Sequence, residues 1–129
     1  MFRRTFFALA AAALAALPFA DARAFSEPFE PAQFEAALAE GGPILVEIAA
    51  SWCPVCRTQQ AVLSDLFEAE RFAGFVALAV DFDTQKDVVR ALGAQMQSTL
   101  IVFADGVEVA RGVGDTSPDA IAALLEAAL

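Results

Sequence analysis

The feature that most constrains this chain is a strand-to-helix junction that carries two cysteines. Residues 44–49 are apolar apart from Glu47 and predict a buried strand, while residues 58–70 have the periodicity of a helix. Cys53 and Cys56, the only cysteines of the chain, lie between the two segments. The sequence therefore predicts both cysteines at the N-terminal end of a helix.

This placement has a chemical consequence. The free N–H groups and the positive dipole end of a helix stabilise a thiolate, which is the species that attacks disulfides. We expect Cys53, exposed at the turn, to be the nucleophile. Cys56 is one turn further in and is expected to resolve the mixed disulfide. Pro54 suits the first helical position because its φ is preset and it has no N–H to lose.

Two other uses of the cysteine pair are weaker. A structural zinc site needs two further Cys or His ligands, and this chain has no His and no other Cys. A structural disulfide between Cys53 and Cys56 would close so short a loop that it would constrain little of the unfolded chain. A redox-active pair is the favoured interpretation.

The N-terminal segment has the features of an export signal. Arg3 and Arg4 precede an apolar run that ends at Pro18, and Ala22-Arg23-Ala24 fits a signal peptidase site. The apolar run is shorter than the about 20 residues of a membrane span. We interpret residues 1–24 as a signal peptide, with a twin-arginine character, and expect a periplasmic domain of residues 25–129. An uncleaved membrane anchor is the alternative.

The charge balance excludes one class of partner. Without the predicted signal peptide the chain keeps five basic and 16 acidic residues, a net charge of −11. Nucleic-acid binding requires the opposite balance, so we expect no nucleic-acid partner. The acidity suits solubility, or attraction to a basic partner.

The hydrophobic pattern predicts one α/β domain in which helices cover both faces of a sheet. Residues 25–31 are expected to be a partly loose lead-in. The alternation of strands and helices favours right-handed crossovers and a mostly parallel sheet with an antiparallel edge hairpin at Asp105-Gly106. The predicted helices span residues 31–40, the cysteine turn to 68, 84–92 and a C-terminal helix after Ser117, and the predicted strands span 44–49, 75–80, 99–103 and 107–111.

Trp52-Cys53-Pro54-Val55-Cys56, the preceding strand and residues 99–103 with the Asp-Gly turn together resemble the thioredoxin family. The resemblance covers essentially all of residues 30–129. It implies a thioredoxin-like fold, a central mixed sheet with helices on both faces, and thiol–disulfide exchange without a cofactor. With export it implies a likeness to periplasmic proteins that reduce oxidised protein thiols, including those that serve cytochrome c maturation. The implied partners are protein thiols and disulfides and a membrane electron donor, and the implied state is a monomer.

The chain departs from the family pattern at three places. The dipeptide between the cysteines is Pro54-Val55, which tunes the stability of the thiolate. Glu47 stands where the family usually has a buried Asp, and the resemblance implies that it is a base that deprotonates Cys56. The alternative is a snorkelling or locally paired glutamate at a strand edge.

The third departure is Ser98, at the position of the family's cis-proline. A cis bond before a non-proline residue costs about 2.5–4 kcal/mol. Either the Gln97–Ser98 bond is trans and the groove is reshaped, or strain is stored there. The resemblance implies that substrate contacts Gln97, Ser98 and Thr99, and also Trp52, Pro54 and Val55. For Trp52 the alternative is core packing.

Two further classes of function stay open. The two cysteines, with Ser98 nearby, could bind Cu(I) or share an iron–sulfur cluster across a dimer. The chain could also be an interaction module whose cysteines have no redox role.

Overall fold

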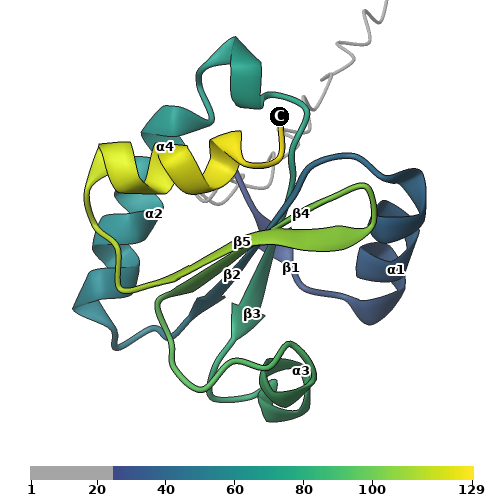
Figure 1. The fold of residues 1–129 in the computed structure, drawn as a ribbon. Helices are drawn as coiled ribbons and strands as arrows, with labels where there is room; N and C mark the ends of the chain where they lie inside the picture. The colour runs from purple at the N-terminus through teal and green to yellow at the C-terminus, as the bar shows by residue number, and fades with distance from the viewer. Residues whose placement is uncertain (1–24) are drawn as a thin grey trace, which may run out of the picture.

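The computed structural model describes residues 25–129, so the predicted signal peptide lies outside the described residues. Figure 1 shows how the helices and strands of the described part are arranged. In chain order they are β1 (Glu27–Pro28), α1 (Pro31–Glu40), β2 (Ile44–Ala49), α2 (Pro54–Leu66), the short 3-10 helix η1 (Glu70–Phe72), β3 (Val76–Asp81), α3 (Lys86–Ala91), β4 (Thr99–Ala104), β5 (Val107–Val113) and α4 (Pro118–Glu126).

The strands form one mixed sheet in the order β1-β3-β2-β4-β5. The pairings of β3 with β1 and β2 are parallel, whereas β4 pairs antiparallel with both β2 and β5. The prediction of a central mixed sheet is confirmed. The expectation of a mostly parallel sheet is wrong, because β4 is antiparallel to β2 as well as to β5. Hydrophobic periodicity identifies a buried strand but does not encode its direction.

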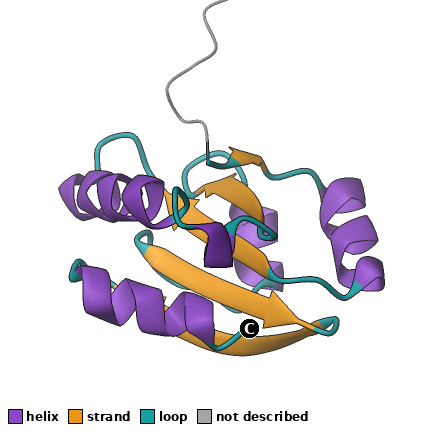
Figure 2. Ribbon diagram, turned by 90° about the horizontal axis from the view of Figure 1, so that it is seen from above, coloured by secondary structure: helices purple, strands orange, loops and turns teal. Residues whose placement is uncertain are grey.

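Helices cover both faces of the sheet, with α1 and α3 on one side and α2 and α4 on the other (Figures 1 and 2). Each face has its own hydrophobic core. Ile48 and Ile101 belong to the core beneath α1 and α3, and Leu45 and Leu100 belong to the core beneath α2 and α4. Side chains of a strand alternate between the faces, so a strand buried on both sides reads as a continuous apolar run.

The lead-in is more ordered than predicted. Glu27 and Pro28 pair with β3 as an edge strand, and the ring of Phe25 stacks on that of Phe67 at a centroid distance of 5.6 Å. The Ser26 hydroxyl donates a hydrogen bond to the Glu47 carboxylate at 3.1 Å. A two-residue strand has too few residues for a periodic pattern, which is why the sequence did not indicate it.

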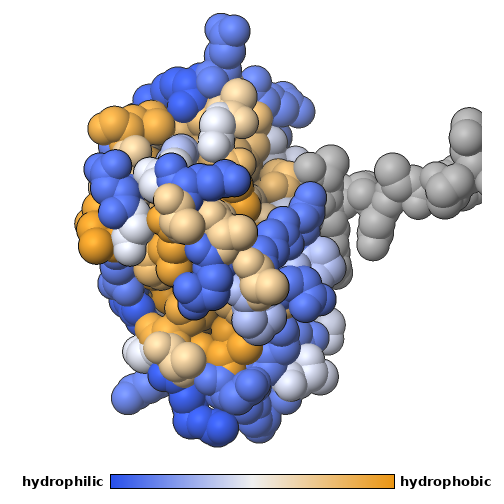
Figure 3. Space-filling model, turned by 90° about the vertical axis from the view of Figure 1, so that its right-hand side faces the viewer, coloured by the Kyte–Doolittle hydropathy of each residue, from blue (hydrophilic) through white to orange (hydrophobic). Residues whose placement is uncertain are grey.

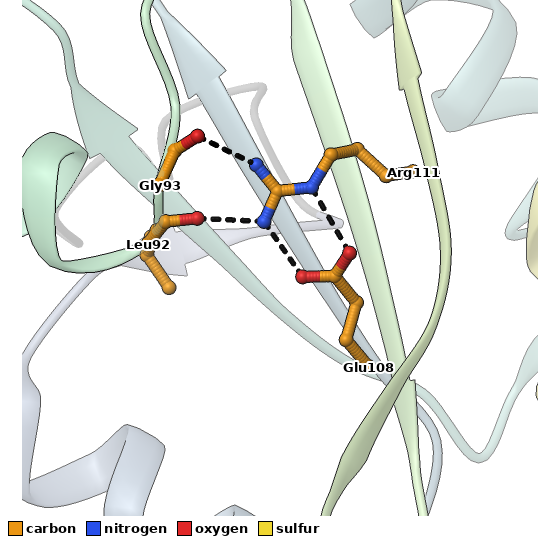
Figure 4. Close-up of polar contacts among 4 residues, drawn as sticks. All are labelled: Leu92, Gly93, Glu108 and Arg111. Carbon is orange, nitrogen blue, oxygen red and sulfur yellow. Dashed lines mark hydrogen bonds and ion pairs between the residues drawn. The ribbon is translucent and has the colours of Figure 1, made fainter.

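The loop between α3 and β4, residues 92–98, is fixed at its start by Arg111 of β5 (Figure 4). The guanidinium donates hydrogen bonds to the carbonyls of Leu92 at 2.6 Å and Gly93 at 3.2 Å. It also binds Glu108 through both carboxylate oxygens, at 2.6 and 3.0 Å. The bonds to the carboxylate lower the pKa of Glu108. The bonds to Leu92 and Gly93 satisfy carbonyls at the C-terminal end of α3.

A shallow groove of about 370 Å³ lies between α1 and α3 and is lined by Phe29, Phe34, Val88 and Leu92 among others. Figure 3 shows this side of the molecule, where hydrophobic patches are interspersed with hydrophilic surface. No helix within residues 25–129 is long and apolar enough to cross a membrane.

Candidate active site

Cys53 is the N-cap residue of α2, as the sequence predicted. Its backbone is extended, with φ −89° and ψ 108°, and its Sγ accepts a hydrogen bond from the backbone N–H of Cys56 at 3.1 Å. Pro54 follows as the first helical residue. An N–H donor and the helix dipole both favour a negative charge on the sulfur of Cys53.

Both cysteines are free thiols, and each exposes only 2% of its surface. The expectation that Cys53 is exposed at the turn is therefore wrong for the residue as a whole. Cys53 and Cys56 pack with Ala50, and Ala49 and Phe82 lie against them. A substrate must reach the sulfur through the small part of Cys53 that its neighbours leave uncovered.

Cys56 holds its proton more strongly than an ordinary cysteine does. Burial, and then the hydrogen bond with Cys53, raise the pKa of Cys56 from 9.0 to about 11. Backbone hydrogen bonds with Ala50 and Ser98 act in the opposite direction and lower the pKa of Cys56 in part. Cys56 therefore keeps its proton at neutral pH and needs a base before it can act as a nucleophile.

Trp52 is 56% exposed, so the core-packing alternative for it is excluded. Its indole Nε1–H donates a hydrogen bond to Oδ2 of Asp83 at 2.8 Å. Asp83 is exposed just after β3, and no pattern in the sequence indicated its contact with Trp52. The bond fixes the indole of the residue that precedes Cys53 in the chain.

The other predicted substrate-contacting residues fall into two groups. Pro54 and Val55 are exposed on the first turn of α2. Gln97 is half-buried, whereas Ser98 and Thr99 are buried. The hydroxyl of Thr99 is occupied by a hydrogen bond to the Met96 carbonyl at 2.7 Å.

Ser98 follows a trans peptide bond and also has a strained backbone, so both alternatives predicted for this position apply. No peptide bond within residues 25–129 is cis, so the Gln97–Ser98 bond is trans. Ser98 nevertheless has a φ of 56°, in the left-handed region that costs a non-glycine residue of order 1 kcal/mol. Its carbonyl accepts a hydrogen bond from the Gly114 N–H at 2.9 Å.

Glu47 lies on β2, the central strand, and is only 4% exposed. The alternative is therefore wrong in placing this glutamate at a strand edge, although Glu47 is paired, with Ser26. Its carboxylate accepts the Ser26 hydroxyl and lines a cavity of about 400 Å³. Ala50 and Arg57 line the same cavity, and the backbone of Ala50 also bonds to the Cys56 thiol.

Gln59 is a buried polar residue that the sequence analysis missed. It lies one turn after Cys56 on α2 and donates from Nε2 to the carbonyls of Ser98 at 3.1 Å and Asp115 at 2.9 Å. The sequence could have indicated it, because Gln59 lies at helical spacing from Val62, Leu63 and Leu66, on the apolar face of the helix.

Among the described residues, no group of three or more His, Cys, Asp or Glu side chains is arranged to hold a metal ion. Within residues 25–129, the two cysteines therefore have no third His, Cys, Asp or Glu beside them with which to bind a metal ion.

Comparison with known proteins identifies the family. Residues 26–127 match the family model for thioredoxin. This chain belongs to the thioredoxin family. Thioredoxin Asp f 29 of Aspergillus fumigatus is 32% identical over 95 residues, which cover 73% of this chain and 86% of that protein. A thioredoxin of Mycobacterium tuberculosis is 34% identical over 77 residues, 60% of this chain and 66% of its own length.

Solved structures agree with this family. The Trxlp structure from Edwardsiella tarda has a TM-score of 0.74 and 41% identity, and the match covers 76% of this chain and 95% of that one. The predicted thioredoxin-like fold is confirmed. As a member of the thioredoxin family with a Cys-X-X-Cys pair, the chain is a thiol–disulfide oxidoreductase.

Proposed function

We propose that this thioredoxin-family protein is exported to the periplasm and reduces disulfides in other exported proteins. The observation that carries the exchange chemistry is the position of Cys53 at the N-cap of α2, with the Cys56 N–H on its sulfur. The reducing direction is supported by relatives that are named thioredoxins, because thioredoxin has a low potential, about −270 mV. Export is supported by the features of residues 1–24.

The reaction proceeds in two steps. The thiolate of Cys53 attacks one sulfur of a substrate disulfide, the substrate S–S bond breaks, and the second substrate sulfur leaves as a thiolate. The thiolate of Cys56 then attacks Cys53 Sγ and releases the first substrate sulfur. The dithiol loses two electrons and becomes a disulfide, and the substrate gains those electrons and the two protons.

Glu47 is the base in this scheme. Cys56 must lose a proton before the second step, and its raised pKa makes that loss unfavourable at neutral pH. Glu47 is the buried carboxylate of the cavity that also borders Ala50, next to the Cys56 thiol. Water in the cavity can carry the proton between the thiol and the carboxylate.

Trp52, Pro54 and Val55 supply side-chain contacts for the substrate, because they are exposed around Cys53. Gln97 adds a partly exposed contact, and Ser98 and Thr99 act through their backbone, since their side chains are buried. The oxidised pair is returned to the dithiol by an electron donor in the membrane, and the protein works as a monomer. The paired cysteines that attach haem in c-type cytochromes are one substrate class within this proposal.

The reduction potential of the Cys53–Cys56 pair tests the direction of electron flow. The domain of residues 25–129 is equilibrated with glutathione or dithiothreitol buffers. A value near −270 mV supports the reductant, and a value near −120 mV identifies a disulfide-forming oxidant instead. A pair that does not cycle overturns the exchange chemistry itself.

Export is tested by expressing the full chain in a bacterium and sequencing the N-terminus of the periplasmic product. We expect a chain that starts at Phe25. An intact N-terminus in the membrane fraction indicates the anchored alternative, and an intact chain in the cytoplasm overturns export.

A further inference from the structure

Gln59 links the active-site helix to two loops that are distant in sequence. It is only 2% exposed, and the two N–H bonds of its amide nitrogen point to the carbonyls of Ser98 and Asp115. Ser98 ends the loop before β4, and Asp115 belongs to the loop between β5 and α4. One side chain therefore fixes both loops to α2.

The carbonyl of Ser98 has two donors, Nε2 of Gln59 and the N–H of Gly114. Both donors fix the peptide that follows Ser98, and Ser98 itself has the left-handed φ of 56°. A serine has no intrinsic preference for this conformation, so the surrounding contacts must hold it. Gln59 is the side chain that does so from within α2.

The held backbone faces the resolving cysteine. The backbone hydrogen bond from Ser98 favours the thiolate of Cys56 and partly offsets the effect of burial on its pKa. Gln59 and Cys56 are three residues apart on α2, so they lie on the same side of the helix. A path of two contacts thus runs from the Gln59 amide through Ser98 to the Cys56 sulfur.

We propose that Gln59 is a positioning residue for the second step of exchange: it holds Ser98 in its left-handed conformation so that the backbone hydrogen bond from Ser98 stabilises the Cys56 thiolate as it forms. The proposal rests on Cys56 being the resolving cysteine. It assigns no role to Gln59 in the first step, because the hydrogen bonds of Cys53 involve Ala50, Cys56 and Arg57 but not Ser98.

The test separates the two steps. In Gln59→Leu, an apolar side chain of similar size fills the site but donates no hydrogen bond. The reduced protein is mixed with oxidised glutathione, and mass spectrometry after acid quenching follows the Cys53–glutathione mixed disulfide and its conversion to the Cys53–Cys56 disulfide. We expect the conversion at pH 8 to slow by about tenfold, the change made by a shift of one unit in the Cys56 pKa. The first step should keep its rate within about twofold, because the hydrogen bonds of Gln59 go to Ser98 and Asp115 and not to Cys53.

A pH profile and a stability control separate positioning from general loosening. The rate of conversion should rise with pH in both proteins, with the profile of Gln59→Leu displaced to higher pH. Leu66→Ala, which removes a half-buried side chain packed in the core under α2 and α4, destabilises the fold without touching the loop. It should leave the pH profile of conversion unchanged.

A second variant guards against a loss of folding. In Gln59→Glu the protonated side chain retains one donor, whereas the ionised one retains none. The amide of Ser98, followed by NMR hydrogen exchange, should be more protected at low pH than at high pH in this variant. Equal conversion rates and pH profiles in Gln59→Leu and the unmodified protein would overturn the proposal, and an absence of any mixed disulfide would instead overturn the exchange chemistry.

Discussion

The backbone N–H of Cys56 donates a hydrogen bond to Sγ of Cys53 at 3.1 Å, so the second cysteine stabilises the sulfur that it later attacks. Its own thiol is buried beneath, with its pKa raised to about 11. The same turn of helix therefore prepares one sulfur to react and keeps the other protonated. This asymmetry sets the order of the two steps.

The raised pKa of Cys56 predicts that folding stability falls as pH rises from 9 to 11. In that interval an unfolded chain has lost the Cys56 proton and the folded chain keeps it, so the slope of the unfolding free energy against pH is negative. Below pH 9 Cys56 is protonated in both the folded and the unfolded chain, so its full contribution to the unfolding free energy is present. Urea unfolding of the reduced domain at several pH values measures the slope.

Cys56→Ala is the control for this titration. The chain contains no His and no Tyr, and its only lysine, Lys86, is exposed, so few other groups titrate in this interval. The variant should have a flatter dependence on pH than the unmodified domain. Identical slopes would show that the folded and unfolded states hold the Cys56 proton equally well.

Replacing Glu47 by Gln tests the proposed base. The amide oxygen of Gln can still accept the Ser26 hydroxyl, so the fold should be retained. We expect the conversion of the mixed disulfide at pH 7 to slow by about 100-fold, the typical contribution of a general base. Stopped-flow measurement of Trp52 fluorescence during oxidation gives the rate.

Ser26→Ala is the matched control, because it removes the hydrogen bond to Glu47 and leaves the carboxylate in place. Its rate of conversion should stay much closer to that of the unmodified protein than the rate of Glu47→Gln. A Glu47→Gln rate equal to the unmodified rate would remove Glu47 from the mechanism.

Arg111→Ala should lower the free energy of unfolding by about 1–2 kcal/mol at pH 7, because four hydrogen bonds on a partly exposed side chain are lost. Since Arg111 depresses the pKa of Glu108, that pair stabilises the fold above the ordinary Glu range and loses its effect as pH falls. The cost of the substitution, measured by urea unfolding, should therefore be smaller at about pH 3. An equal cost at both pH values would contradict the account of the pair.

The hydrogen bond from Trp52 to Asp83 predicts a substrate-dependent effect. Asp83→Ala frees the indole, and kcat/KM for a protein disulfide should fall by roughly threefold to tenfold, the equivalent of one hydrogen bond. A small disulfide that needs no contact with Trp52 should react at an unchanged rate. Asp87→Ala, which removes an exposed aspartate of α3, is the control and should change neither rate.

Much of this fold could be predicted from the sequence because its segments are unambiguous. The helix at residues 31–40 and the strand at 44–49 appear with the predicted bounds, and Cys53 takes its predicted place before α2. Proline at the first helical position marks the starts of α1, α2 and α4, a signal that needs no tertiary information.

What the sequence could not supply depends on contacts between distant segments. The direction of β4 follows from how the chain returns after α3, and no local pattern records it. The role of Asp83 depends on a bond to a residue 31 positions away, and that of Gln59 on bonds to residues 39 and 56 positions away. Polar side chains of this kind look like surface residues until their partners are known.

The most direct test of the central claim compares Cys53→Ser with Cys56→Ser in the reaction with a protein disulfide. The account predicts that Cys56→Ser accumulates a stable mixed disulfide through Cys53, because the first step is intact and the second is blocked. Cys53→Ser should form none at neutral pH, because Cys56 is buried and holds its proton. A mixed disulfide that accumulates through Cys56 in Cys53→Ser would contradict the account.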